Sequence, residues 1–179
     1  MFHGWDNYFF MLGSAAASLI GLLFVVVTLT QGFDRNQALR ASGIYMTPLA
    51  VHFAVVLSVS AIALAPGLDA GKSAVVLEIG ALVGLGNAIR TCLGIPALAN
   101  TTGNQPHWSD VWFYGVAPAV IYVALGVIAA AVGAGAAWAA TATAALLLVL
   151  LLVGIRNAWD LLTWMAPGPP PAPPATPPS

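Results

Sequence analysis

Five long runs of apolar residues constrain the fold of this chain more than any other feature of its sequence. Crossing a hydrocarbon core of about 30 Å takes roughly 20 mostly apolar residues, and the runs at 8–30, 44–65, 73–95, 111–132 and 141–159 meet that length. Charged residues make up only 6% of the chain, too few to cover a water-exposed surface. We therefore expect an all-α, polytopic bundle of about five transmembrane helices in a lipid bilayer.

The residues between the runs predict where the helices end. Pro66 and Pro96 follow the second and third runs, and proline stops a helix because it has no N–H to donate. Only residues 133–140 separate the last two runs, which predicts a tight helical hairpin. The first run follows a segment without Lys or Arg and is too long for the apolar region of a signal peptide, so we interpret it as an uncleaved helix.

Basic residues predict the orientation in the membrane, because cytoplasmic loops carry an excess of Lys and Arg. With five spans, one side of the bilayer receives only Lys72, and this side also holds the N-terminus. The other side receives Arg35, Arg40, Arg90 and Arg156. We expect the N-terminus outside and the C-terminus in the cytoplasm.

The chain divides into a helical domain, 1–165, and a proline-rich tail, 166–179. Eight of the 14 tail residues are proline, so the tail is expected to form extended polyproline II rather than a helix or strand. A solvated tail is one interpretation. The other is a strip that docks in the aromatic groove of a partner, because a preformed polyproline helix loses little entropy on binding.

Composition argues against several classes of function. A net charge of −1 without a basic run lacks the footprint of a nucleic-acid-binding protein. Cys92 is the only cysteine, and no Cys/His cluster has metal-site spacing. His52 is the only histidine within a predicted span, so one chain cannot supply two histidines to a haem. No catalytic motif is present. We expect neither an enzyme nor a bound cofactor or metal.

Small residues form stripes on two of the predicted helices. Gly13, Ala17 and Gly21 follow one another at spacings of four on the first helix. Gly80 and Gly84 share one face of the third helix, and this stripe continues along Ser73, Asn87 and Thr91. Small residues allow the backbones of neighbouring helices to approach closely. Both stripes are expected to pack against helices, of this chain or of another.

Glu78 is the only acidic residue within a predicted span. It lies five residues inside the third run and points about 160° away from Gly80, so it needs a partner of its own. One interpretation is a functional carboxyl group on an ion or proton route. The other is a structural carboxyl group, bonded to a neighbouring helix or reaching the outer surface.

Further polar residues gather toward the predicted cytoplasmic side. Together with Glu78, a polar path could include Asn87, Arg90 and His52. Arg156 and Asp160 are four residues apart on one helical face and can pair directly, and with Asn157 they could line an inner vestibule. The alternative is that these basic residues reach lipid headgroups and fix the topology.

Pro48 and Pro118 each remove a backbone hydrogen bond near the start of a span, and Pro118 is deep enough to kink its helix. The two helices run in the same direction, so these prolines do not indicate an inverted repeat. As a parallel repeat they are weak support, and we identify no better internal repeat.

Trp5, residues 7–10 (NYFF) and residues 13–17, 19, 21–25 and 27 form a distinctive pattern in the first helix. In this pattern the chain resembles a group of small bacterial multi-pass membrane proteins, and residues 156–159 (RNAW) are a second, looser point of resemblance. Most members are uncharacterised, and some are automatically labelled as modulators of the FtsH protease. The resemblance implies a multi-pass fold in the bacterial cytoplasmic membrane and brings no catalytic residue. The proline-rich tail departs from that pattern.

Two functions of different classes follow from these patterns. The first is a non-enzymatic accessory or assembly protein that packs with itself or with other membrane proteins, as the small-residue stripes and the tail suggest. The second is an oligomeric ion or proton channel or transporter, in which Glu78, Asn87, Arg90 and His52 line a polar path.

Overall fold

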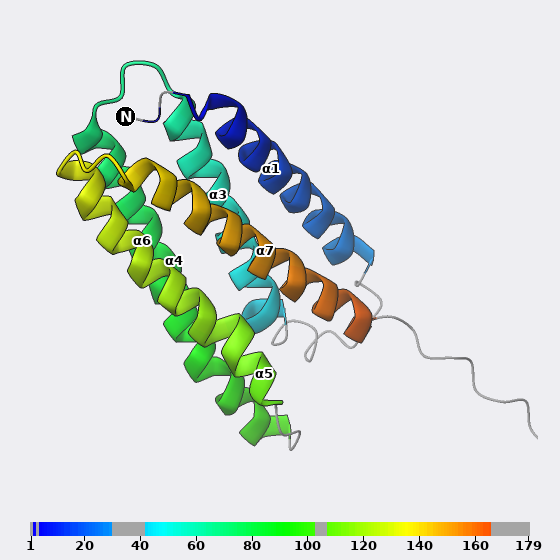
Figure 1. The fold of residues 1–179 in the computed structure, drawn as a ribbon. Helices are drawn as coiled ribbons and strands as arrows, with labels where there is room; N and C mark the ends of the chain where they lie inside the picture. The colour runs from blue at the N-terminus through cyan, green and yellow to red at the C-terminus, as the bar shows by residue number, and fades with distance from the viewer. Residues whose placement is uncertain (1, 3, 30–41, 103–106, 166–179) are drawn as a thin grey trace, which may run out of the picture.

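The computed structural model describes residues 2, 4–29, 42–102 and 107–165 (Figure 1). In this part of the chain the secondary structure is helical, and five helices are long and apolar enough to cross a membrane, which confirms the all-α bundle. The elements are α1 (Asp6–Leu29), the π-helical turn η1 (Ser42–Met46), α3 (Thr47–Leu64), α4 (Ala70–Thr102), α5 (Trp108–Val111), the π-helical turn η2 (Trp112–Val116), α6 (Ala117–Gly133) and α7 (Ala139–Met165).

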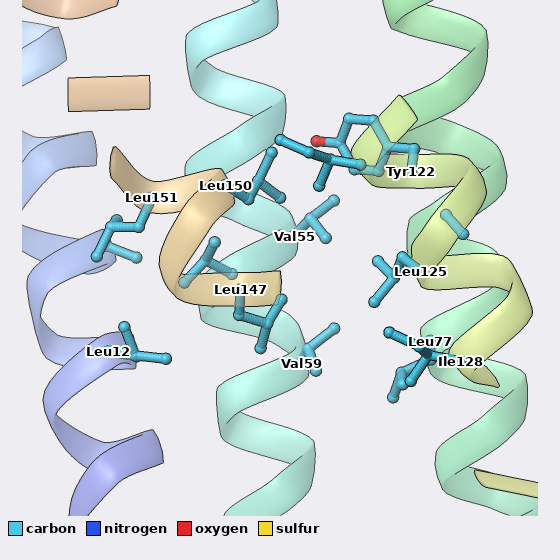
Figure 2. Close-up of a cluster of buried hydrophobic side chains, with 14 of the residues drawn as sticks. Leu12, Val55, Val59, Leu77, Tyr122, Leu125, Ile128, Leu147, Leu150 and Leu151 are labelled. Atoms are coloured by element: carbon cyan, nitrogen blue, oxygen red, sulfur yellow. The ribbon is translucent and has the colours of Figure 1, made fainter. Parts of the chain in front are cut away.

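The five spans alternate in direction, so α1, α4 and α7 run one way and α3 and α6 run the other (Figure 1). The core lies between α3, α4, α6 and α7, where leucine, isoleucine and valine side chains from all four helices meet (Figure 2). α1 packs on the outside of α3 and reaches α7, because the Tyr8 hydroxyl donates to the carbonyl oxygen of Ala144 at 3.0 Å.

Two of the predicted helix ends are confirmed and one is wrong. α3 ends at Leu64, before an extended Ala65 and Pro66, and a short turn joins α6 to α7 as predicted. α4, however, continues through Pro96. A helix tolerates proline where water or neighbouring groups satisfy the carbonyl that loses its partner, and Pro96 is exposed near the end of its span.

α4 begins at a capped turn outside the span. The Asp69 carboxylate accepts a hydrogen bond from the backbone N–H of Lys72 at 2.8 Å and pairs with the Lys72 ammonium at 3.3 Å. A side-chain oxygen at this position satisfies an N–H that the helix leaves unpaired. The same backbone N–H, followed by the Lys72 side chain, holds the pKa of Asp69 below its usual range.

The structure accommodates Pro48 and Pro118 in the same way. Each proline is near the first position of its α-helix and follows a five-residue π-helical turn. In η2 the N–H of Ala117 donates to the carbonyl of Trp112, five residues earlier. The next carbonyl in this pattern is that of Phe113, and Pro118 has no N–H to give it. The Asn157 side chain fills the gap with a hydrogen bond from Nδ2 at 2.8 Å.

The hairpins α3–α4 and α6–α7 correspond position by position, which we did not expect from the sequence. His52 and Tyr122 are 70 positions apart, and the same separation (118 minus 48) joins Pro48 to Pro118. Residues 83–88 (VGLGNA) and 153–158 (VGIRNA) continue this register. Further pairs are buried in both hairpins: Val55 and Leu125, Val59 and Ala129, Ser73 and Thr143, Leu77 and Leu147, Ala81 and Leu151, and Thr91 and Leu161.

The two hairpins also pack on each other reciprocally. Tyr122 of α6 lies directly against Gly84 of α4, and Phe53 of α3 lies against Gly154 of α7, where an added Cβ would be 2.6 Å from Phe53 Cε1. Gly84 and Gly154 are equivalent positions, so each hairpin's first helix covers the other hairpin's glycine. The exchange is only partial, because the equivalent of Tyr122 is His52 rather than Phe53, and α6 packs far more extensively on α4 than α3 does on α7. His52 and Tyr122, which are equivalent positions, contact each other between the two hairpins.

Candidate functional site

Glu78 lies on the outer face of α4, where its side chain is exposed. Its carboxylate rests against α6 at Gly126, so that a Cβ added to Gly126 would be 3.6 Å from Glu78 Oε2. From 126 to the end of α6 at 133 is seven residues, or about 10 Å along the helix. No cation and no hydrogen-bond donor among the described residues pairs with this carboxylate.

The surroundings of Glu78 are apolar and uncovered. Ile79 and Leu82 of α4 and Val123 and Val127 of α6 all have exposed side chains. In a membrane, such a face contacts lipid or another protein. A carboxylate placed there without a partner is unfavourable by several kcal/mol. On this face, therefore, no side chain in the described part of the chain pairs with Glu78.

His52 is in a different environment, at the centre of the bundle. Its side chain is fully buried, and Nδ1 lies 2.7 Å from the Tyr122 hydroxyl. The other ring nitrogen, Nε2, is buried without a hydrogen-bond partner in the described part of the chain. Asn87 Nδ2 and Ser60 Oγ share this condition. Buried polar atoms are normally paired, so these three are the interior atoms with capacity to bind something further.

A polar cluster forms where η2 meets the last part of α7. The Tyr114 hydroxyl donates to the carbonyl of Asn157 at 2.7 Å, and Arg156 donates to Asn157 Oδ1 at 3.2 Å while its guanidinium stacks 3.9 Å from the centre of the Phe113 ring. The predicted pair of Arg156 and Asp160 is present, with 4.0 Å between Nη1 and Oδ2. The partners in this cluster are satisfied by one another, which favours a structural role.

The four residues of the predicted polar path do not form one interior route in the single chain. His52 is buried and Asn87 is partly buried, whereas Glu78 and Arg90 are exposed on the outside of α4. Among the described residues, Arg90 makes no hydrogen bond or ion pair with His52 or with the cluster around Asn157. A route that included all four side chains would need surfaces from a neighbouring molecule.

Some of the predicted small-residue positions pack against other helices of the chain, and others are exposed. A Cβ added to Gly13 would be 3.1 Å from Ser60 Cβ, one added to Gly80 would be 3.4 Å from Val55, and Gly84 contacts Tyr122. Ala17 and Gly21, in contrast, are exposed. The first stripe thus packs on α3 at one end only, beside a groove of about 230 Å³ between α1 and α3.

Some interpretations concern residues outside those that the structure describes. They include the proline-rich tail, 166–179, and the loop that carries Arg35 and Arg40. Sequence reasoning also missed three residues that shape the sites, namely Gly126, Tyr122 and Phe113. The repeated residues at 83–88 and 153–158 are the signal that could have aligned the hairpins and paired Tyr122 with His52.

No group of three His, Cys, Asp or Glu side chains within the described ranges is arranged to hold a metal ion. Comparison with known proteins found no matching family model, no matching curated protein and no matching solved structure. The geometry of the bundle and its polar atoms is therefore the basis on which its function is inferred.

Proposed function

We propose that this chain is a non-enzymatic accessory or assembly protein of the bacterial cytoplasmic membrane, with its N-terminus outside and its C-terminus inside. The single observation that carries the proposal is Glu78, an exposed and unpaired carboxylate on an apolar face of a membrane-spanning helix. Such a group is stable when a neighbouring molecule in the membrane supplies its partner. The resemblance of the first helix to small bacterial membrane proteins supports the location.

Native mass spectrometry tests this proposal. The chain is extracted from the membrane in polymer-bounded lipid discs, without detergent, and its assemblies are weighed. We expect a protein assembly heavier than the 18.3 kDa of one chain, with a smaller assembled fraction in Glu78→Gln. A chain that carries lipid only, with or without residues 166–179, contradicts the assembly function.

A second function, an oligomeric ion or proton channel or transporter, is favoured by one specific observation. His52 Nε2 is buried between the two hairpins and has no partner among the described residues. Membrane transporters with parallel repeats bind their substrates near the middle of the bilayer at the interface between repeats. A channel built in this way would use His52 and Asn87 inside the bundle, and a neighbouring molecule would bring Glu78 and Arg90 into the path.

Flux through reconstituted liposomes separates the two functions. The channel requires a measurable ion or proton flux that falls in His52→Ala and in Glu78→Gln. Liposomes that hold the assembled protein and remain tight rule out the channel and leave the assembly function in place. A flux that both variants leave unchanged means that these residues do not line the path.

A further inference from the structure

One of two corresponding sides of the hairpins is covered by a further helix. α1 packs on α3 and reaches α7 through Tyr8. In the shared register α3 corresponds to α6 and α7 to α4, so the corresponding position lies on α6 beside α4. Among the described residues no helix occupies it (Figure 1). In the described part of the chain, α6 therefore lacks the cover that α1 gives to α3.

Side chains on the side of α3 and α7 next to α1 are more buried than their equivalents on α6 and α4, as expected if no helix covers the second side. Val56 and Ser60, beside α1, have exposed fractions of 0%, whereas their equivalents Gly126 and Ala130 are half-buried and exposed. Val127 is 64% exposed. Two further pairs follow the same order, since Leu57 and Leu148 are half-buried where Val127 and Glu78 are exposed. Ala61, which lines the groove beside α1, is exposed while its equivalent Ala131 is half-buried. At four of these five pairs the second side is the more accessible one.

Glu78 lies at the edge of this open position. It is the equivalent of Leu148 in α7 (148 minus 78 is 70), and its carboxylate contacts α6 at Gly126. Gly126 itself faces α4, since a Cβ added there would be 3.8 Å from Ala81 Cβ, and the small residue Ala130 is exposed one turn further along α6. A helix seated here would contact the small Ala130 side chain and one carboxylate.

The negative charge of Glu78 favours a helix of a different protein over a second copy of this chain at the open position. A second copy that packs by a two-fold axis at this face places its own Glu78 opposite Glu78, and two adjacent carboxyl groups supply no counter-charge and cannot both stay ionised. Lys72 is six residues from Glu78, about 9 Å along the helix, and is already paired with Asp69. The other described basic residues lie toward the opposite end of the bundle, since Arg90 follows Glu78 by 12 residues on α4, about 18 Å, and Arg156 is in the second half of α7. A helix of a different protein can place a basic side chain opposite Glu78.

We propose that the open face formed by Glu78, Val127 and Ala130 binds one transmembrane helix of a different membrane protein, whose basic side chain pairs with Glu78. The bound helix occupies the position on α6 that α1 occupies on α3. This inference rests on the proposed assembly function and names the chemistry of the partner: a single apolar span with one Lys or Arg about two turns below its outer end.

Synthetic helices test the proposal without knowledge of the natural partner. One probe is a leucine–alanine span with a lysine about 10 Å below its outer end, and the control probe has leucine there. Each carries an acceptor dye, and the full chain carries a donor dye on its N-terminal amine in phosphatidylcholine vesicles. We expect energy transfer to the lysine probe with an apparent affinity about tenfold higher for the native chain than for Glu78→Gln, which corresponds to about 1.4 kcal/mol.

The matched control variant is Asp6→Asn, which neutralises an exposed acid at the start of α1, away from the open face. It should bind the lysine probe as the native chain does, while Val127→Trp should block binding because its side chain fills the face. Equal binding of the lysine probe by the native chain and Glu78→Gln overturns the proposal. So does Glu78-dependent energy transfer between two copies of this chain, which makes a second copy the occupant.

These outcomes are distinguishable from failure of the assembly function. If native assemblies persist unchanged in Glu78→Gln, the chain assembles through another surface and the open face is not its docking site. If the chain extracted from its native membrane carries lipid only, the assembly function itself fails, whatever the synthetic helices do.

Discussion

The two hairpins of this bundle share a register and differ in what covers them. In α3–α4 the first helix is shielded by α1, and its polar Ser60 is fully buried. In α6–α7 no further described helix covers the outer side of α6, and Glu78 of α4 is exposed beside it. The comparison teaches that, among the described residues, α1 covers one of two surfaces that correspond in register. Glu78, the carboxyl group without a partner among them, lies on the uncovered side, where we propose that the partner helix binds.

The equivalent glycines provide the largest expected effect. Gly84→Val places a branched side chain against the Tyr122 ring, and overpacking of this kind costs about 3 kcal/mol of unfolding free energy. Gly154→Val should cost less, because its added Cβ would be 2.6 Å from the nearest Phe53 ring atom, a less severe overlap than the one with Tyr122 at Gly84. Unfolding of the reconstituted protein by denaturant measures both. Gly86→Val is the control, since nothing lies within 4 Å of its Cβ position, and an equal loss there would show that packing at Gly84 is not responsible.

The second-largest effect is expected at the contact between His52 and Tyr122, which joins the two hairpins. Tyr122→Phe leaves both nitrogens of the buried His52 ring without a partner, which should lower the unfolding free energy by about 2 kcal/mol. Replacing both residues, as His52→Leu with Tyr122→Phe, should cost less than the sum of the two single changes. The same unfolding assay gives this coupling. Strict additivity would mean that the two side chains do not interact in the membrane.

The equivalent asparagines should respond unequally. Asn157→Leu removes the donor that replaces the missing N–H of Pro118 at the Phe113 carbonyl, so we expect a loss of about 1.5 kcal/mol. Asn87→Leu removes an amide nitrogen that has no partner and should change stability by less than about 0.5 kcal/mol. Equal losses in the two variants would contradict the assignment of a distinct role to Asn157.

The smallest loss of unfolding free energy is expected for a change in α1, the helix that covers α3. Tyr8→Phe removes the hydrogen bond from α1 to the Ala144 carbonyl and should lower the unfolding free energy by about 0.5 kcal/mol. The change should appear as faster hydrogen exchange of amides in α1, with α6 and α7 unchanged. Faster exchange spread evenly over all five spans would mean that α1 is not an independently attached cover.

Much of the fold could be predicted from the sequence, because the length of an apolar run determines whether it can cross a bilayer. The five spans, the stop before Pro66 and the turn between α6 and α7 required only local patterns. The continuation of α4 past Pro96 did not follow from them, since it depends on whether surrounding groups can satisfy a freed carbonyl. The π-helical turns at Pro48 and Pro118 are likewise adjustments to packing.

The candidate sites were only partly predictable. Helical periodicity correctly separated Glu78 from the buried face of Gly80 and Gly84, because both directions follow from one helix. The partner of His52 lies 70 residues away, and hydropathy carries no information about which faces of two distant helices meet. The spacing of the VG…NA segments did contain that information, since a repeat aligns both hairpins at once.

Oxygen accessibility at two equivalent positions tests the central claim most directly. Single nitroxide labels are placed at Leu57→Cys and at Val127→Cys, in a Cys92→Ser background, with one chain in each lipid disc. The account predicts that the label at 127 contacts membrane-dissolved oxygen freely, whereas α1 shields the label at 57. Equal accessibility at the two positions would contradict the account, because the two hairpins would then be equally covered.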